Sequence, residues 1–257
     1  MRNKLFKSTF LLLLLSFSVT LANSHEDNTF LENTRISVDF GLGIPVGLAI
    51  KEKLKKESKG NFADFKTSPN IGVGVLVNYN FPISETIHIG PEIGFIYGFT
   101  RKITYHTHNI TLEEKCAQIP IYLRITSPST ETSAIGGNVI LGYEFNTFFS
   151  SKYKQSGNYP DLHASLVGDK DLKEVIKDFP TTSGSIVIGG GLEFPKGFYF
   201  VGKIKVATEL FKLAKQKELK DNVFEDELGA KLIHLTRLAT ANIVEFNLGV
   251  DVMKLIE

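Results

Sequence analysis

The chain has 257 residues, of which 42% are hydrophobic and 22% charged, and its formal net charge is +1. This length suffices for one domain with a substantial core. The balanced charge leaves no basic excess that would indicate a nucleic-acid partner. With 22 Gly, 20 Phe and no Trp, the composition favours strands and tight turns over long helices.

Residues 1–24 have the composition of a secretory signal peptide. The positive start contains Arg2, Lys4 and Lys7, an apolar stretch follows, and the small residues around Ala22 offer a cleavage site. The apolar stretch is shorter than the roughly 20 residues of a membrane-spanning helix, so cleavage is favoured over an uncleaved anchor. The sequence therefore predicts an exported protein.

About eight segments of the mature chain alternate between apolar and polar residues with a period of two. From Ile36 to Ile50 every even residue is apolar, whereas the odd residues are small or polar. This run matches the roughly 9–11 residues with which a tilted strand crosses a bilayer. The other alternating segments are Ile71–Phe81, Ile87–Phe99, Ile119–Ile125, Val139–Phe145, Ile186–Phe194, Phe198–Leu210 and Val244–Val252.

Short and long connections follow one another strictly between these segments. The expected short connections are Phe81–Glu85, Ser127–Ser133 and Pro195–Gly197, and the expected long ones are Lys51–Thr67, Thr104–Glu113, Phe149–Ser183 and Lys212–Ala241. Outer-membrane barrels have short periplasmic turns and longer external loops. Helical spacing after Asp171 and after Leu228 predicts short helices within two of the long connections.

The expected fold class is therefore all-β: a transmembrane up-and-down antiparallel β-barrel of about eight strands, with short helices in its external loops. No later segment is long and apolar enough for a membrane-spanning helix, and only a closed barrel satisfies all backbone groups in hydrocarbon. Residues 25–34 are expected to form an N-terminal periplasmic segment, and residues 35–257 the barrel.

Two features interrupt the alternation. Pro120 has no N–H to donate, so it is expected to mark a bulge or the start of a strand. The run Gly189–Gly191 is expected to let a strand bend. It is not a phosphate-binding loop, because neither a Lys-Ser/Thr pair nor a helix follows it.

The polar face of the predicted barrel carries charges of both signs. An eight-stranded barrel is just filled by its own side chains, and charges inside it must be paired. We expect a structural network of paired charges in place of an open pore, with ion conduction or catalysis as the alternatives. Besides His88, the expected members are Arg35, Asp39, Glu92, Arg124, Glu144, Glu193, Lys203, Lys205, Glu209, Glu245 and Asp251.

No catalytic, cofactor-binding or metal site is predicted. His106 and His108 lie in an expected external loop without a nearby carboxylate or Cys, which makes a weak metal site. His163 lies near Ser165, but no G-x-S-x-G motif occurs. Two other classes stay open: a lipid-modifying outer-membrane enzyme, and a soluble ligand-binding barrel whose apolar face points inward. The lone Cys116 makes no intramolecular disulfide.

Three segments resemble strands of the small outer-membrane β-barrel family, PorT-like or OmpA-like. Ile87–Gly98 is similar to a strand with a hydrophobic-x-Pro-Glu-hydrophobic motif. Gln118–Arg124 resembles a hydrophobic-Glu-Ile-Pro-hydrophobic strand with Gln118 at the acidic position, and Gly137–Glu144 resembles the strand that follows. The final Leu255-Ile256-Glu257 departs from the family's frequent aromatic ending.

The predicted architecture indicates a structural or surface-interaction protein, and no cofactor is expected. Its implied partners are the lipid of the outer membrane, the barrel-insertion machinery during assembly, and an extracellular partner bound through the external loops.

Overall fold

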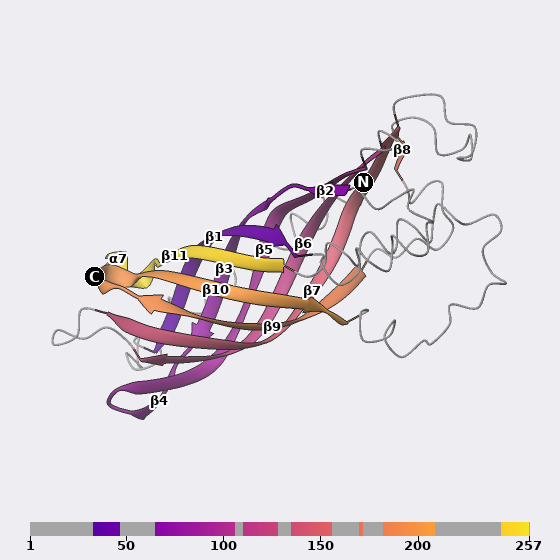
Figure 1. Ribbon diagram of the computed structural model, residues 1–257. Coiled ribbons are helices and arrows are strands. Elements are labelled where there is room, and N and C mark those ends of the chain that lie inside the picture. Colours follow the sequence, from indigo (N-terminus) through magenta and orange to yellow (C-terminus); the bar gives the residue numbers. More distant parts are fainter. Residues whose placement is uncertain are drawn as a thin grey trace, which may run out of the picture.

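The computed structural model describes residues 33–46, 65–105, 110–127, 135–155, 170–171, 182–208 and 243–256. Each long strand pairs antiparallel with the next long strand along the chain, and the last pairs with the first, which closes a barrel (Figure 1). The eight strands are β1 (Thr34–Pro45), β3 (Asn70–Tyr79), β5 (Ile87–Tyr105), β6 (Ile110–Ser127), β7 (Gly136–Gln155), β9 (Thr182–Glu193), β10 (Phe198–Ala207) and β11 (Ile243–Asp251). Each contains all or most of one of the alternating sequence segments, so the predicted barrel is confirmed.

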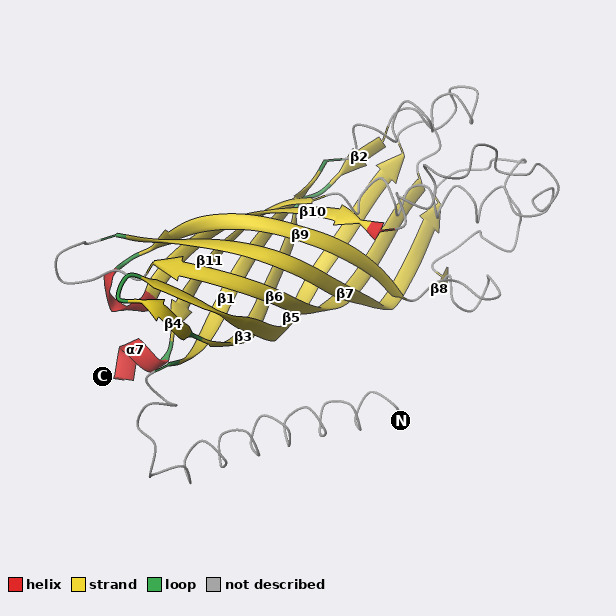
Figure 2. Cartoon of the chain, turned by 90° about the horizontal axis from the view of Figure 1, so that it is seen from below, coloured by secondary structure: helices red, strands yellow, loops and turns green. Residues whose placement is uncertain are grey.

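Shorter elements lie at the two ends of the barrel. Strand β4 (Phe81–Ser84), the 3-10 helix η2 (Pro195–Gly197) and helix α7 (Met253–Ile256) lie at the end where β1 begins. Strands β2 (Phe65–Thr67) and β8 (Lys170–Asp171) lie at the other end (Figures 1 and 2). Among the described residues, no helix has the length and apolar character needed to span a membrane.

The strands are tilted against the barrel axis, as the register shows. Lys205 pairs with Ile243 of β11. In the other direction the pairs lead from Lys205 through Val187, Gly142, Tyr122, Glu92 and Asn78 to Arg35 of β1. Arg35 lies next to the pair Ser37–Asp251, at the far end of β11. A barrel closed with such a stagger has strands inclined by about 35–45°.

Side chains alternate between a polar interior and an apolar exterior. In β1, Arg35 and Asp39 are buried, whereas Phe40 and Ile44 are exposed. Every long strand has at least one exposed large hydrophobic side chain. This polarity is the reverse of a soluble barrel, so the alternative with an inward apolar face does not agree with the structure.

Three neighbouring strands are longer than predicted. β5, β6 and β7 have 19, 18 and 20 residues, against 9 to 12 for the other long strands. The expected loop over Thr104–Glu113 is wrong, because β5 continues to Tyr105 and β6 begins at Ile110. The expected loop from Phe149 likewise begins as strand β7. In these extensions Lys102 of β5 and Glu113 of β6 are register partners.

Two local predictions also need correction. Pro120 marks neither a bulge nor a strand start, because it pairs with Glu144 within the β6–β7 ladder. The register of that ladder shifts between Lys115 and Cys116, where Phe149 of β7 is skipped. The expected turn at Phe81–Glu85 is mostly strand, because β4 pairs with the start of β5 and the turn lies at Glu85–Thr86.

Several predictions fall outside the described residues. They are the signal peptide, residues 25–32, the helix after Leu228, the connection Lys212–Ala241, and the side chains of Glu209, His106, His108, His163 and Ser165. Asp171, the expected first residue of a helix, lies in β8 and pairs with Lys152.

Candidate functional site

The candidate site is the charged interior of the barrel. The alternation of the strands directs the predicted charges inward, and all of them except Glu209 lie among the described residues and are buried. His88 of β5 is only half-buried. The charged side chains form two clusters, one near the end where β1 begins and one further along the axis.

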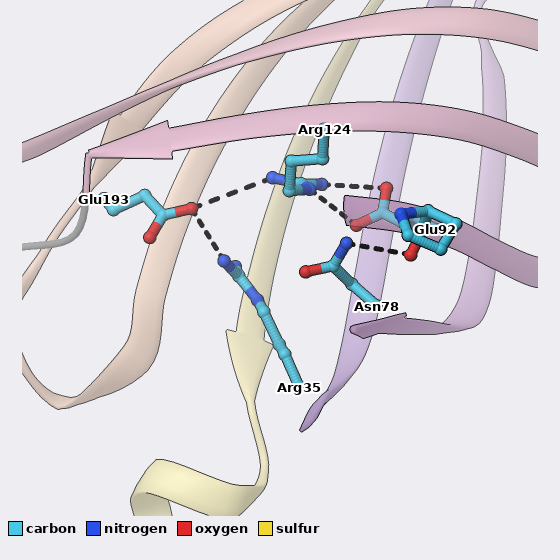
Figure 3. A network of polar contacts seen from close by, with 6 residues as sticks. Arg35, Asn78, Glu92, Arg124 and Glu193 are labelled. Atoms are coloured by element: carbon cyan, nitrogen blue, oxygen red, sulfur yellow. Dashed lines mark hydrogen bonds and ion pairs between the residues drawn. The ribbon is translucent and has the colours of Figure 1, made fainter. Parts of the chain in front are cut away.

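The end cluster consists of Arg35, Glu92, Arg124 and Glu193 (Figure 3). Arg35 donates from Nη1 to Glu193 Oε1 over 2.6 Å. Arg124 donates from Nε and Nη2 to the two carboxylate oxygens of Glu92 over 2.6 and 2.9 Å. Nη1 of Arg124 lies 3.8 Å from Glu193 Oε1, so positive and negative groups alternate across the lumen. Four strands, β1, β5, β6 and β9, contribute one charge each.

The central cluster consists of Glu144, Lys203, Lys205 and Glu245. Lys205 Nζ lies 2.5 Å from Glu245 Oε2 and 2.7 Å from Glu144 Oε2. Lys203 Nζ lies further from its carboxylate, 3.5 Å from Glu245 Oε1. All four side chains are fully buried. Lys205 is therefore the cation that joins the two carboxylates.

Two tyrosines complete the clusters. The Tyr122 hydroxyl donates a hydrogen bond to Glu144. The Tyr199 ring lies 4.1 Å from Arg35 Cζ and 5.5 Å from Arg124 Cζ, within the range of cation–π attraction. Alternation puts Tyr122 and Tyr199 on the polar face of their strands, each between two apolar residues, but the predicted network did not include them. Their inward register and their proximity to basic positions were the available signal.

Gly249 makes room for the Tyr199 ring. A Cβ atom at position 249 would lie 2.2 Å from Tyr199 Cζ and 2.5 Å from Asp39 Oδ1. Real Cβ contacts are never that short, so the ring could not occupy this position beside any residue with a side chain.

Buried apolar side chains also lie in the interior. Leu76, Ile96, Cys116 and Phe148 form one buried cluster, and Ile140, Val187 and Val201 pack with the two tyrosines in another. Sequence reasoning emphasised the charges and missed these layers. They lower the local dielectric, which strengthens the paired charges and raises the cost of an unpaired one.

Two predicted members stand apart from both clusters. Asp39 and Asp251 make no direct ion pair within the described parts of the chain, although both are buried. Asp251 instead accepts a hydrogen bond from the backbone N–H of Met253 over 3.1 Å, at the start of α7. Asp251 therefore fixes the end of the last strand.

The described residues hold no group of three His, Cys, Asp or Glu side chains suited to a metal ion. The interior instead presents charges that neutralise one another. The ion pairs join residues of different strands across the lumen.

No protein-family model matches the chain, and no curated protein matches it in sequence. The solved structures to which it is similar include Ail, the attachment invasion locus protein of Yersinia pestis, in complex with the heparin analogue sucrose octasulfate. That match has 9% sequence identity, covers 85% of this chain and 95% of that chain, and has a TM-score of 0.38. Another structure of Ail matches with 9% identity, the same coverage and a TM-score of 0.37. The PorT-like or OmpA-like family therefore stays a prediction.

Proposed function

We propose that the chain is an integral β-barrel protein of a bacterial outer membrane, structural or surface-interacting in type and not an enzyme. One observation on β10 carries the proposal. Lys203 and Lys205 are 1% exposed, whereas Ile204 between them is 54% exposed. Water around the barrel would favour the opposite orientation, since apolar surface gains and charged surface loses from burial.

The backbone supports the same location. A closed antiparallel barrel pairs its backbone groups within the wall, which is the requirement for strands in hydrocarbon. The shorter barrel strands have 9 to 12 residues, close to the roughly 9–11 that cross a bilayer at a tilt. Lipid of the outer membrane is then the solvent for the exposed apolar side chains.

The interior supports a filled lumen in place of an open pore. Ion pairs in both clusters join different strands, and buried apolar clusters lie in the same interior. Such a plug stabilises the barrel and blocks diffusion of solutes, so the proposed network has a structural role. It includes Glu209, whose side chain lies outside the described residues.

The remaining assignments follow from this location. Residues 1–24 would direct export, residues 25–34 would lie in the periplasm, and the insertion machinery would assemble the barrel. The ends of β5, β6 and β7 project from the end opposite α7 (Figure 1). That end would face outward, and its loops would meet an extracellular partner.

Extraction of cell envelopes tests the membrane location. The mature protein should dissolve only in detergent, and its gel mobility should differ between unheated and boiled samples. Recovery of the protein in buffer without detergent, with no mobility shift, would overturn the proposal.

Vesicle swelling tests the filled lumen. Vesicles containing the protein should swell in small sugars no faster than protein-free vesicles, with an open porin as positive control. Swelling at the porin's rate would show that the lumen is open.

A further inference from the structure

The hairpin formed by β4 and the start of β5 extends from the end of the barrel where β1 begins (Figures 1 and 2). All four residues of β4 are exposed. Ile83 is the most exposed of its apolar residues at 65%, and Phe81 and Ile87 are also exposed. Exposure of these apolar side chains to water is unfavourable, and the rest of the barrel does not cover them.

The apolar side of this hairpin continues the apolar exterior of the barrel. Phe81 and Ile83 keep the spacing of the outward residues of β3, of which Ile71 is the first and Tyr79 the last. The rings of Tyr79 and Phe81 meet edge to face with their centroids 4.7 Å apart. The exposed apolar side chains of the barrel wall and of the hairpin therefore form one continuous surface. The same environment would cover both.

The tip of the hairpin has the opposite character. Ser84, Glu85 and Thr86 are polar and exposed, and the Thr86 N–H donates to Ser84 Oγ over 3.3 Å. The hairpin thus has apolar sides and a hydrated tip. This distribution fits a polar–apolar boundary, where an apolar flank enters lipid and the polar end stays in water.

Pro82 argues against a protein strand as the covering. A partner strand would need N–H and C=O groups along the free edge of β4, and Pro82 has no N–H to offer. Proline on an edge strand is a common protection against such pairing.

We infer that this hairpin lies against the lipid of the periplasmic leaflet, with Phe81, Ile83 and Ile87 at the boundary between headgroups and acyl chains. The inference rests on the proposed membrane location. The headgroup layers add roughly 10–15 Å to the hydrocarbon thickness, so a short hairpin beyond the wall still meets lipid. It would set the depth of the barrel in the bilayer.

The absence of Trp from the chain allows a direct test. Three single-tryptophan variants would be reconstituted separately into phosphatidylcholine vesicles: Ile83→Trp on the hairpin flank, Glu85→Trp at its tip, and Ile121→Trp on the apolar exterior of β6. Quenching by acrylamide would report exposure to water, and quenching by brominated phospholipid would report contact with lipid.

The expected order of acrylamide quenching is Ile121→Trp lowest, Ile83→Trp next and Glu85→Trp several-fold higher, with lipid quenching in reverse order. The inference would be overturned if acrylamide quenched Ile83→Trp as strongly as Glu85→Trp while brominated lipid quenched Ile121→Trp. That result would leave the membrane location intact. Acrylamide quenching at Ile121→Trp without lipid quenching would instead overturn the membrane location. A gel mobility shift on boiling would establish that each variant is folded.

Discussion

Arg124 and Glu92 form a two-point ion pair in the interior, with both donor–acceptor distances below 3 Å. The guanidinium matches the carboxylate at both oxygens, which is the strongest geometry for such a pair. Arg124 also approaches Glu193 and thereby joins Glu92 to Arg35. The end cluster therefore depends on this one arginine.

Replacing Glu92 with Ala should destabilise the barrel strongly. The substitution leaves Arg124 buried with only a distant carboxylate, and removing one partner of a buried pair costs about 3–5 kcal/mol. Urea unfolding in vesicles would measure the loss of unfolding free energy. The double variant Glu92→Met/Arg124→Met should be less destabilised than Glu92→Ala alone, because it buries no unpaired charge. Equal losses in both variants would contradict the importance of pairing.

Replacing Lys205 with Met should cost more stability than replacing Lys203 with Met. Lys205 lies 2.5 and 2.7 Å from two carboxylates, whereas Lys203 lies 3.5 Å from one. Loss of Lys205 leaves two buried negative charges, so we expect a loss near the upper part of the range of about 3–5 kcal/mol. The two variants form a matched pair on β10 and would be compared by the same unfolding measurement. A larger loss of unfolding free energy for Lys203→Met would show that the short ion-pair distances of Lys205 do not determine the stabilisation.

Gly249→Ala should displace the Tyr199 ring and destabilise the barrel by about 1–3 kcal/mol, as overpacking of a filled interior does. Gly202→Ala is the matched control, since a Cβ atom there would have its nearest neighbour at 3.9 Å. Tyr199→Leu in the Gly249→Ala background should recover part of the lost stability. If Tyr199→Leu recovers no stability, the destabilisation by Gly249→Ala does not arise from the contact with the Tyr199 ring.

Leu123→Arg on the exterior of β6 should destabilise the protein in vesicles by about 2–4 kcal/mol, the cost of Arg near the middle of a bilayer. Ser127→Arg is the control at the end of the same strand, where the cost falls to about 0–1 kcal/mol. Both side chains are exposed, so neither change affects the interior. Similar small losses for the two variants would contradict a lipid environment around Leu123.

The period-two alternation was sufficient to predict the barrel strands and which side of each strand is charged. Lys203 and Lys205 face inward as predicted because Ile204 and Phe200 occupy the alternate positions. The ends of β5, β6 and β7 escaped prediction, because charged residues such as Arg101, Lys102 and Glu113 interrupt the apolar pattern there and these segments were predicted to be long connections. Their pairing depends on the neighbouring strands, which no local pattern reveals.

The partners of each charge were equally beyond the sequence. Arg35 meets Glu193 and not Asp39 of its own strand, because the stagger of the closed barrel decides which positions face each other across the lumen. The role of Gly249 depends on the same stagger, which brings the Tyr199 ring against it. The alternation determines on which side of the barrel wall a side chain lies, whereas the strand register determines which side chains it contacts there.

The pair Arg35–Glu193 joins residues 158 positions apart on strands that are not neighbours in the wall. Neither charge reaches the other until β1 and β11 have met, because an open sheet leaves the two strands at a distance. An unclosed sheet in hydrocarbon would carry isolated charges, each costing at least a few kcal/mol. The buried ion pairs therefore favour complete assembly of the barrel. A partly formed barrel would expose unpaired charges to lipid, whereas the closed barrel keeps them paired in its interior.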